Sequence, residues 1–227
     1  MKVAIILPVS DSMPHLKPMI EALYESTHFP FRLIIIESGS KDGTKQYVDK
    51  LFEEKDNVEV YHTAKRGLVK AINYGIKAAG DLDIYLTQDD VIHFKMYGRD
   101  WLEDMWKVSQ DSKIGVITGL GGFGISGPDF IDGLRWIGTW NAYIPRRIIK
   151  KIGLFDEEFG PGDDVDYSYR VLNAGYSLAV VDYWVHHHRL TEHGDSDNSK
   201  KITKMGKKFR KKYKLDEYNE SSNNQST

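Results

Sequence analysis

Three observations predict an α/β fold with a mostly parallel sheet flanked by helices and followed by a smaller subregion. Short apolar runs without alternation recur over the first 90 residues, as expected for strands that are buried on both faces. Segments with apolar residues at helical spacing separate these runs. Polar and acidic residues follow directly after the runs, and in a parallel sheet such positions all lie at one edge.

The first half of the chain alternates strictly between strands and helices, which is typical of a parallel sheet. The predicted strands cover residues 3–7, 31–37, 58–61 and 83–86. The predicted helices cover residues 14–26, a segment that ends at Phe52, and residues 67–79. Ser12 is placed to cap the first helix, and Gly80 is placed to cap the last.

The second half, residues 92–195, is less regular. Helices are predicted over residues 101–109, 146–151 and 163–174, and strands over 114–120 and 176–181, with an aromatic, β-rich segment at 136–144. The glycine-rich stretch 119–127 does not fit a dinucleotide-binding loop, because it lies outside the first strand–helix turn. It predicts a mobile loop instead.

Composition limits the class of protein. The chain has 227 residues, 41% of them hydrophobic and 28% charged, which is typical of a soluble globular domain with a substantial core. A formal net charge of −2 gives no general attraction for nucleic acid, and the absence of cysteine excludes disulfides and thiolate metal sites. The apolar run after Lys2 is too short for a signal peptide or a membrane span. We therefore expect a cytoplasmic protein, at most peripheral to a membrane.

The most informative stretch is residues 82–91, where an apolar strand runs directly into Asp89 and Asp90. Adjacent carboxylates repel each other unless a cation or a proton lies between them. Oxygen ligands suit Mg²⁺ or Mn²⁺, and Mg²⁺ sites commonly take the rest of their ligands from substrate phosphates. A solvated turn is the alternative interpretation. Ser10 and Glu37 end neighbouring predicted strands, so we expect them at the same edge of the sheet.

Two further groups of polar residues lie in the second half. Asp163, Asp164 and Asp166 begin a predicted helix; capping favours acidic residues there, but three in four positions exceed what a cap needs. Three consecutive histidines follow the last predicted strand. If that strand continues, His186 and His188 share one face and His187 points away. Neutral histidine is a common metal ligand.

The C-terminal region is strongly basic. Nine basic residues and no acidic ones occur from Lys200 to Lys214, and four apolar residues at helical spacing accompany them: Ile202, Met205, Phe209 and Tyr213. The pattern predicts a basic amphipathic helix over residues 196–216. Such a helix either contacts an anionic membrane surface or packs on the domain with its basic face in solvent. The polar residues 217–227 predict a disordered tail.

A series of motifs between about residue 3 and residue 190 resembles the family 2 glycosyltransferases of the GT-A (Rossmann-like) fold. The motifs are Ile5-Ile-Leu-Pro-Val9, Ile35-Ile-Glu-Ser-Gly-Ser-Lys-Asp-Gly-Thr44, Arg66-Gly-Leu to Ala71-Ile-Asn-Tyr-Gly75, Leu86-Thr-Gln-Asp-Asp-Val91, Ile152-Gly-Leu-Phe-Asp-Glu157 and Gly162-Asp-Asp-Val-Asp166. The resemblance implies one domain over residues 1–195. Residues 1–91 would form its nucleotide-binding half and residues 92–195 its acceptor and catalytic half.

The resemblance implies an inverting, metal-dependent hexosyltransferase with Mn²⁺ or Mg²⁺ as cofactor. Its donor would be a UDP-, GDP- or TDP-sugar, and its acceptor a hydroxyl of a glycan, a lipid-linked or a protein acceptor. Such a reaction needs stabilisation of the leaving diphosphate and a base for the acceptor hydroxyl. The resemblance assigns the base to Asp164 and the metal to Asp90 with His186 or His188.

The resemblance also assigns binding residues. The nucleotide and donor residues would be Pro8, Val9, Ser10, Glu37, Ser40, Arg66, Asn73 and Asp89. Glu37 stands where the family usually has Asp, and Gln88 occupies the first position of the family's Asp-x-Asp motif. The acceptor residues would be Trp136, Trp140, Tyr143 and Asp163, with ordinary core packing as the alternative for the three aromatic side chains.

Three other functions compete with the one that the resemblance implies. A nucleotidyltransferase of similar fold would carry a glycine-rich phosphate loop with arginine directly after the first strand, which residues 8–12 lack. A glycoside hydrolase would use Asp90 and Asp164 as its pair of carboxylates and need no nucleotide. A catalytically inactive GT-A-like binding module, anchored by the basic helix, would tolerate the loss of Asp164.

Overall fold

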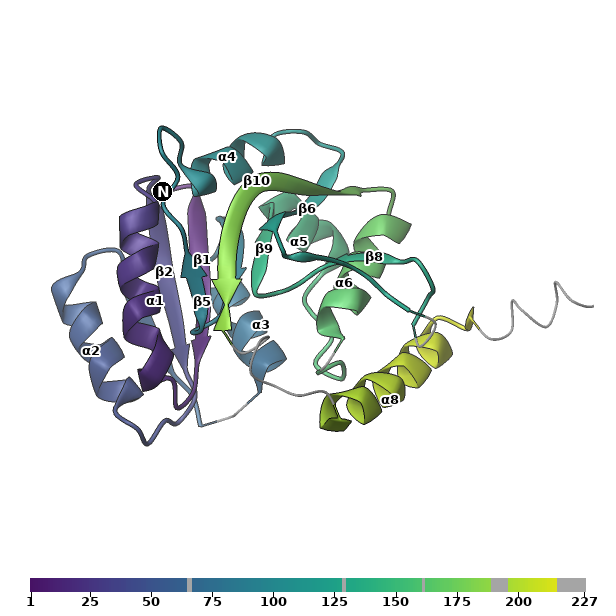
Figure 1. The fold of residues 1–227 in the computed structure, drawn as a ribbon, viewed down its shortest axis with the longest axis horizontal. Helices are drawn as coiled ribbons and strands as arrows, with labels where there is room; N and C mark the ends of the chain where they lie inside the picture. The colour runs from purple at the N-terminus through teal and green to yellow at the C-terminus, as the bar shows by residue number, and fades with distance from the viewer. Residues whose placement is uncertain (65–66, 128–129, 161, 189–195, 216–227) are drawn as a thin grey trace, which may run out of the picture.

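One eight-stranded sheet forms the centre of the computed structural model, which describes residues 1–64, 67–127, 130–160, 162–188 and 196–215. Its strands are β1 (Val3–Val9), β2 (Phe31–Glu37), β3 (Val58–His62), β4 (Asp83–Thr87), β5 (Val91–His93), β6 (Ile114–Leu120), β9 (Asn141–Ile144) and β10 (Ser177–His187). They lie in the order β3-β2-β1-β4-β9-β6-β10-β5 (Figure 1). Only β9 and β5 run against the others, so the prediction of a mostly parallel sheet is confirmed.

Helices cover both faces of this sheet (Figure 1). They are α1 (Met13–Ser26), α2 (Thr44–Glu54), α3 (Leu68–Ala78), α4 (Trp101–Ser109), α5 (Arg146–Ile152) and α6 (Asp163–Asn173). The buried residues of α1, α2 and α4 form one core cluster with one face of the sheet. Those of α3, α5 and α6 form a second cluster with the other face.

The first strand shows how the sheet is held between its layers. Every residue of β1 is buried. Val3, Ile5 and Leu7 belong to the cluster with α1, and Ala4 and Ile6 belong to the cluster with α3. Alternate residues of a strand point to opposite faces, so an unbroken apolar run fills both layers.

Gly75 allows α3 to approach β1 closely. A Cβ atom at this position would lie 2.4 Å from the Ile6 side chain, which is closer than two carbon atoms can pack. The tight contact brings the start of α3 up to the carboxyl edge of the sheet. The glycine at this point of the predicted helix is therefore required for packing.

The last strand is longer than predicted. The sequence predicts a strand over 176–181, whereas β10 has 11 residues, Ser177–His187. Its first part pairs in parallel with β6, and its last three residues pair in antiparallel with β5. The register shifts between Val181 and Trp184, where β10 leaves β6. This second pairing sets His187 opposite Val91, next to the acidic pair.

The prediction of a mobile loop over 119–127 is wrong for part of that stretch. Here β7 (Phe123–Ile125) pairs with β8 (Arg135–Ile137) in a separate two-stranded ribbon. The Trp136 ring packs directly on Gly124, where a Cβ atom would come within 2.3 Å of the ring. The glycine thus permits a strand packed under an aromatic ring.

The basic C-terminal helix is α8 (Ser196–Lys212), and it packs on the domain. Phe209 is fully buried in a third core cluster with Phe130, Phe159 and Val165. Met205 and Tyr213 pack against the same cluster, whereas the side chain of Ile202 and the predicted disordered tail 217–227 lie outside the described residues. Within the described ranges, no helix combines the length and the hydrophobicity needed to cross a membrane.

Candidate functional site

A cleft of about 230 Å³ opens at the carboxyl edge of the sheet, between the ends of β1, β2 and β4 and the start of α3. It is lined by Pro8, Val9, Ser10, Ser38, Gly67, Leu68, Ala71, Gln88 and Asp89. Four of the predicted donor residues therefore lie together: Pro8, Val9, Ser10 and Asp89. Sequence reasoning missed Ser38 and Gln88, although each follows a strand whose end was recognised.

Hydrogen bonds between loops fix the wall of this cleft. Ser12 stands at the start of α1, but its hydroxyl accepts from the Ser10 N–H at 3.0 Å and does not cap the helix as predicted. The Met13 N–H donates instead to Asp42 Oδ2 at 2.9 Å. Ser40 Oγ accepts from the Asp11 N–H at 3.0 Å, so Ser40 ties two loops together and is not among the residues that line the cleft.

Glu37 is buried beneath this edge, and both its oxygens are engaged. Its Oε1 accepts from the Ser40 N–H at 2.5 Å, and its Oε2 lies 3.0 Å from His62 Nδ1. Burial alone would raise the pKa of Glu37, but these hydrogen bonds outweigh it and lower the pKa, so the carboxylate is ionised at neutral pH. His62 was missed, although it ends β3 as Glu37 ends β2; its Nε2 lies 2.8 Å from Asp49.

The two carboxylates after β4 point in different directions. Asp89 is 7% exposed and lines the cleft, whereas Asp90 is 1% exposed. Asp90 Oδ1 lies 3.4 Å from His187 Nε2, and the carbonyl oxygen of Asp90 accepts from the His188 N–H at 3.1 Å. The end of β10 therefore holds Asp90 in place.

The histidine beside Asp90 is His187, which replaces His186 and His188 of the sequence prediction. The inner face of β10 carries Tyr183 and Val185, and His187 continues that face. His186 is exposed, and its ring contacts that of His188 at a centroid distance of 4.5 Å. The physical reason is the parity of the strand: alternate residues share a face, and the strand extends six residues beyond its predicted end.

The donor set fits a divalent cation that takes part of its coordination from a substrate. Asp90 and His187 supply one carboxylate and one imidazole. The described residues contain no group of three His, Cys, Asp or Glu side chains that would hold a metal alone. Mg²⁺ and Mn²⁺ are commonly held by one or two protein ligands together with phosphate oxygens and water. His187 Nδ1 is buried without a hydrogen-bond partner in the described part of the chain.

A second acidic group begins α6. Gly162 precedes it with φ of 106°, a backbone conformation that favours glycine. Asp163 is 6% exposed and its carboxylate is hydrogen-bonded to the Thr139 side chain. Asp164 is partly exposed and accepts from the Val165 N–H at 2.8 Å. Burial raises the pKa of Asp164 to about 6, and burial together with the Asp164 charge raises the pKa of Asp163 well above its usual range.

A chain of contacts joins these two acidic groups. The Asp163 carboxylate is hydrogen-bonded to the Thr139 side chain. The next residue, Trp140, places its ring 4.7 Å from that of His187, which lies beside Asp90. The start of α6 and the end of β4 therefore lie on the same side of the molecule. Trp140, a predicted acceptor residue, stands between them.

Residues 4–163 match the family model described as Glycosyl transferase family 2. The chain belongs to this family. Its relatives include the succinoglycan biosynthesis protein ExoA of Rhizobium meliloti (25% identical over 200 residues, 78% of this chain and 60% of the relative). Glycosyltransferase AglE of Haloferax volcanii is 22% identical over 199 residues, 79% of this chain and 64% of the relative. The chain thus spans less than two thirds of the length of either relative.

Solved structures share the fold. Mannosyltransferase PcManGT from Pyrobaculum calidifontis, in complex with GDP-Man and Mn²⁺, has a TM-score of 0.65 and 21% identity, and covers 80% of this chain and 55% of its own. S. aureus TarS in complex with UDP-GlcNAc has a TM-score of 0.61 and 20% identity, and covers 81% of this chain and 57% of its own. These neighbours are glycosyltransferases with the GT-A fold, which confirms the fold predicted from the motifs.

The remaining residues predicted from the family motifs lie elsewhere. Asn73 is buried, and its side-chain amide is hydrogen-bonded to both the carbonyl oxygen and the N–H of Phe155, at 2.8 and 3.0 Å. It therefore joins α3 to the loop before α6 and does not line the cleft. Tyr143 is fully buried, and its hydroxyl donates to Asp83 at 2.7 Å, so the ring belongs to the core. Arg66 lies outside the described residues.

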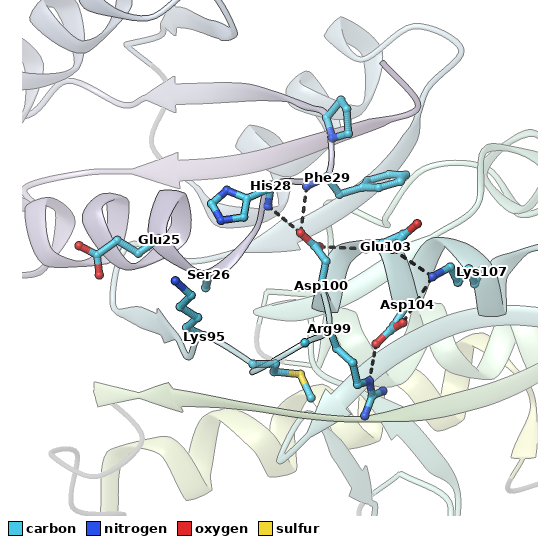
Figure 2. Close-up of a pocket in the computed structure, with 13 residues that line it drawn as sticks. Glu25, Ser26, His28, Phe29, Lys95, Arg99, Asp100, Glu103, Asp104 and Lys107 are labelled. Atoms are coloured by element: carbon cyan, nitrogen blue, oxygen red, sulfur yellow. Dashed lines mark hydrogen bonds and ion pairs between the residues drawn. The ribbon is translucent and has the colours of Figure 1, made fainter.

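A larger hollow, of about 570 Å³, does not carry the family site. It lies between the end of α1 and the start of α4 (Figure 2), and α1 runs back from the carboxyl edge, so the hollow is at the opposite edge of the sheet. Several of its charged groups already have partners. Asp100 accepts from the His28 N–H at 2.6 Å, and Arg99 pairs with Asp104 at 2.9 Å.

Proposed function

We propose that the protein is an inverting glycosyltransferase, which moves a sugar from a nucleoside-diphosphate donor to an acceptor hydroxyl with the help of a divalent cation. One observation carries the proposal. The cleft at the carboxyl edge ends at Asp89, and the next residue, Asp90, lies beside His187. Contacts through Trp140 and Thr139 lead from His187 to the carboxylates of α6. This arrangement supports a proposal in which a nucleotide cleft, a cation site and a base follow one another along one side of the molecule.

Each part has a distinct role in this proposal. The walls formed by Pro8, Val9 and Ser10 bind the nucleoside, and Asp89 contacts its ribose or diphosphate. Asp90 and His187 hold the cation, which supplies electrostatic stabilisation of the leaving diphosphate when bound. Glu37, ionised and held by the Ser40 N–H and His62, fixes the loop after β2 whose first residue, Ser38, lines the cleft.

Asp164 acts as the general base. It accepts the proton of the acceptor hydroxyl as that oxygen attacks the anomeric carbon, and the nucleoside diphosphate leaves from the opposite face in a single displacement. A carboxylate with a pKa of about 6 is a stronger base than an ordinary aspartate and is still ionised at neutral pH. Such a displacement inverts the anomeric centre and requires no covalent intermediate.

The donor class follows from the cleft and the family. Relatives of the same fold hold GDP-mannose and UDP-GlcNAc. We propose a nucleotide sugar of this class, with Mn²⁺ or Mg²⁺. The acceptor is a hydroxyl that reaches Asp164 from the side of Trp140 and the β7–β8 ribbon.

A thermal-shift experiment tests the cation and donor site. UDP, GDP, TDP and their sugars are added to the full chain, each with and without Mn²⁺. A ligand at about a hundred times its dissociation constant stabilises the native state by roughly 2.7 kcal/mol. We expect the nucleotides of one nucleobase to raise the melting temperature only when Mn²⁺ is present. Asp90→Asn should remove that increase.

Asp182→Asn is the matched control, because Asp182 lies on β10 with its side chain 78% exposed. Its metal-dependent shift should equal that of the wild type. If no nucleotide stabilises the wild type in either metal state, the transferase proposal is wrong. Turnover of glycosides without any nucleotide would point to a hydrolase.

A further inference from the structure

A row of lysines runs along the outward face of α8 and continues into the turn that follows the helix. Its members are Lys201, Lys204, Lys207, Lys211 and Lys214, and each is exposed. The four in the helix recur every three or four residues, so they share one face over about 15 Å, and Lys214 follows in the turn after the helix. No ion pair joins any of them to another described residue. The row is therefore a strip of uncompensated positive charge.

The opposite face of the same helix is fixed to the domain. Phe209 is buried in the third core cluster, and Lys208, at the edge of the row, pairs with Glu158 at 2.8 Å. Asp166, 1% exposed, accepts from Lys212 at 2.7 Å and from the Tyr213 hydroxyl at 2.8 Å. The lysine row is thus held in a fixed orientation and is not a loose tail.

The rest of the chain carries the opposite charge. The full sequence has 31 basic and 33 acidic residues, and the nine basic residues from Lys200 to Lys214 leave 22 basic against 33 acidic elsewhere. An anionic surface would repel the body of the protein and attract only this face. This separation of charge therefore favours binding with α8 turned toward the anionic surface.

The form of the row favours a flat, diffuse anion over a specific ligand. The exposed members are all lysine, which acts as a point charge, whereas arginine is preferred for bidentate recognition of single phosphates. The aromatic residues of the helix, Phe209 and Tyr213, face the domain and are not available to stack on nucleobases.

We propose that the lysine row of α8 is a docking surface for an anionic lipid bilayer. Each lysine within a Debye length of the headgroups contributes electrostatic attraction, and the buried apolar face does not need to insert. Glu158 and Asp156 connect α8 to the loop that runs into Asp163 and Asp164. Docking therefore brings the acceptor half of the protein to the membrane.

Vesicle flotation tests this surface and needs no donor sugar, so its result is independent of the transferase activity. The full chain is mixed with phosphatidylcholine vesicles that contain or lack phosphatidylglycerol. We expect binding only to the acidic vesicles, and a loss of that binding as salt is raised from about 50 mM to about 300 mM.

Substitution of all five lysines by glutamine should weaken binding at least about 30-fold, since one lysine near an acidic membrane is worth about fivefold. The same five changed to arginine should bind as the wild type does. A control with five exposed lysines on other elements changed to glutamine has the same net charge: Lys17, Lys50, Lys95, Lys113 and Lys151. This control variant should lose less than about threefold in affinity for the acidic vesicles.

Several results would overturn the proposal. They are equal binding to neutral and acidic vesicles, no binding to acidic vesicles at the lower salt, and equal loss in the two glutamine variants. A short DNA duplex that binds more tightly than the acidic vesicles would assign the row to nucleic acid instead. Unchanged melting temperatures of the variants show that α8 remains folded.

Discussion

The two halves of the proposed site are built in different ways. In the nucleotide half, each wall of the cleft is the end of a parallel strand or the start of the following helix. In the acceptor half, each functional group depends on a contact between segments far apart in the chain: His187 on the pairing of β10 with β5, Asp163 on Thr139, and the loop before α6 on Asn73.

Part of the proposed site therefore depends on the topology of the sheet, and part depends on individual side-chain contacts. A parallel sheet brings its carboxyl ends together whatever residues stand there. The acceptor half has no such guarantee, and its geometry rests on individual hydrogen bonds and ring contacts. Substitutions in the acceptor half should therefore alter catalysis while the nucleotide cleft still forms.

The largest expected effect comes from Asp164→Asn. Loss of a general base lowers kcat by about 10²–10⁴-fold, whereas nucleotide binding should remain as in the wild type. Initial rates and nucleotide-induced melting shifts measure the two properties separately. Asp132→Asn, at an exposed position of the β7–β8 connection, serves as the control. If Asp164→Asn also abolishes nucleotide binding, the two halves are not separable in the way described.

The pH dependence of kcat should also distinguish the acceptor half from the nucleotide half. The base is active when deprotonated, and the pKa of Asp164 is raised to about 6 by burial. We expect kcat to fall about tenfold per pH unit below that value and to level off above it. Rates measured between about pH 5 and pH 8, with nucleotide affinity measured in parallel, show whether only the acceptor half titrates. A flat profile across this range would exclude Asp164 as the base.

Removal of the Asn73 side chain should weaken the attachment of α3 to the loop before α6. Asn73→Ala leaves the buried N–H and carbonyl of Phe155 without partners, which costs about 1–3 kcal/mol of unfolding free energy. Denaturant titration measures the loss. Gln46→Ala, at an exposed position of α2, should change stability by less than about 0.5 kcal/mol. A similar loss in both variants would show that the link to Phe155 does not matter.

The smallest expected effect is a gain in stability from Asp163→Asn. In the folded protein the pKa of Asp163 is raised well above its usual range, so folding favours the protonated form. Its favourable contribution is present below the ordinary pKa and is lost as pH rises toward the folded-state value. An amide stays neutral, so we expect added stability at pH about 7.5 and none at pH about 4. Denaturant unfolding of the wild type and the variant at both pH values measures the difference in stability. A gain at the lower pH alone would contradict the prediction.

The first half was largely predictable from its sequence. Unbroken apolar runs identified β1, β2 and β4, and the adjacent carboxylates after β4 marked the edge where the cleft lies. In the second half, α4 and β6 have the predicted bounds. These elements share strong local signals, either helical spacing or a run of buried residues, and such signals survive any tertiary arrangement.

The contacts that complete the site were not predictable in the same way. Three-residue β5 carries no pattern of its own, and only its pairing with β10 makes it a strand. The apolar residues Val181, Tyr183 and Val185 alternate in the sequence, and continuing that alternation would have placed His187 on the inner face, but the strand was predicted to end at residue 181. Asn73 was recognised within a motif and Tyr143 as an aromatic candidate, but their partners, Phe155 and Asp83, are set by tertiary packing.

The length of β10 restricts how this chain can change during evolution. Its first part is locked to β6 and its last part to β5. Insertion or deletion of one residue between these parts would reverse the face of everything beyond it, turning His187 to solvent and His186 or His188 toward Asp90. Point substitutions are compatible with the strand, but single-codon indels are not. Related sequences should therefore keep a constant spacing here even where few of the residues match.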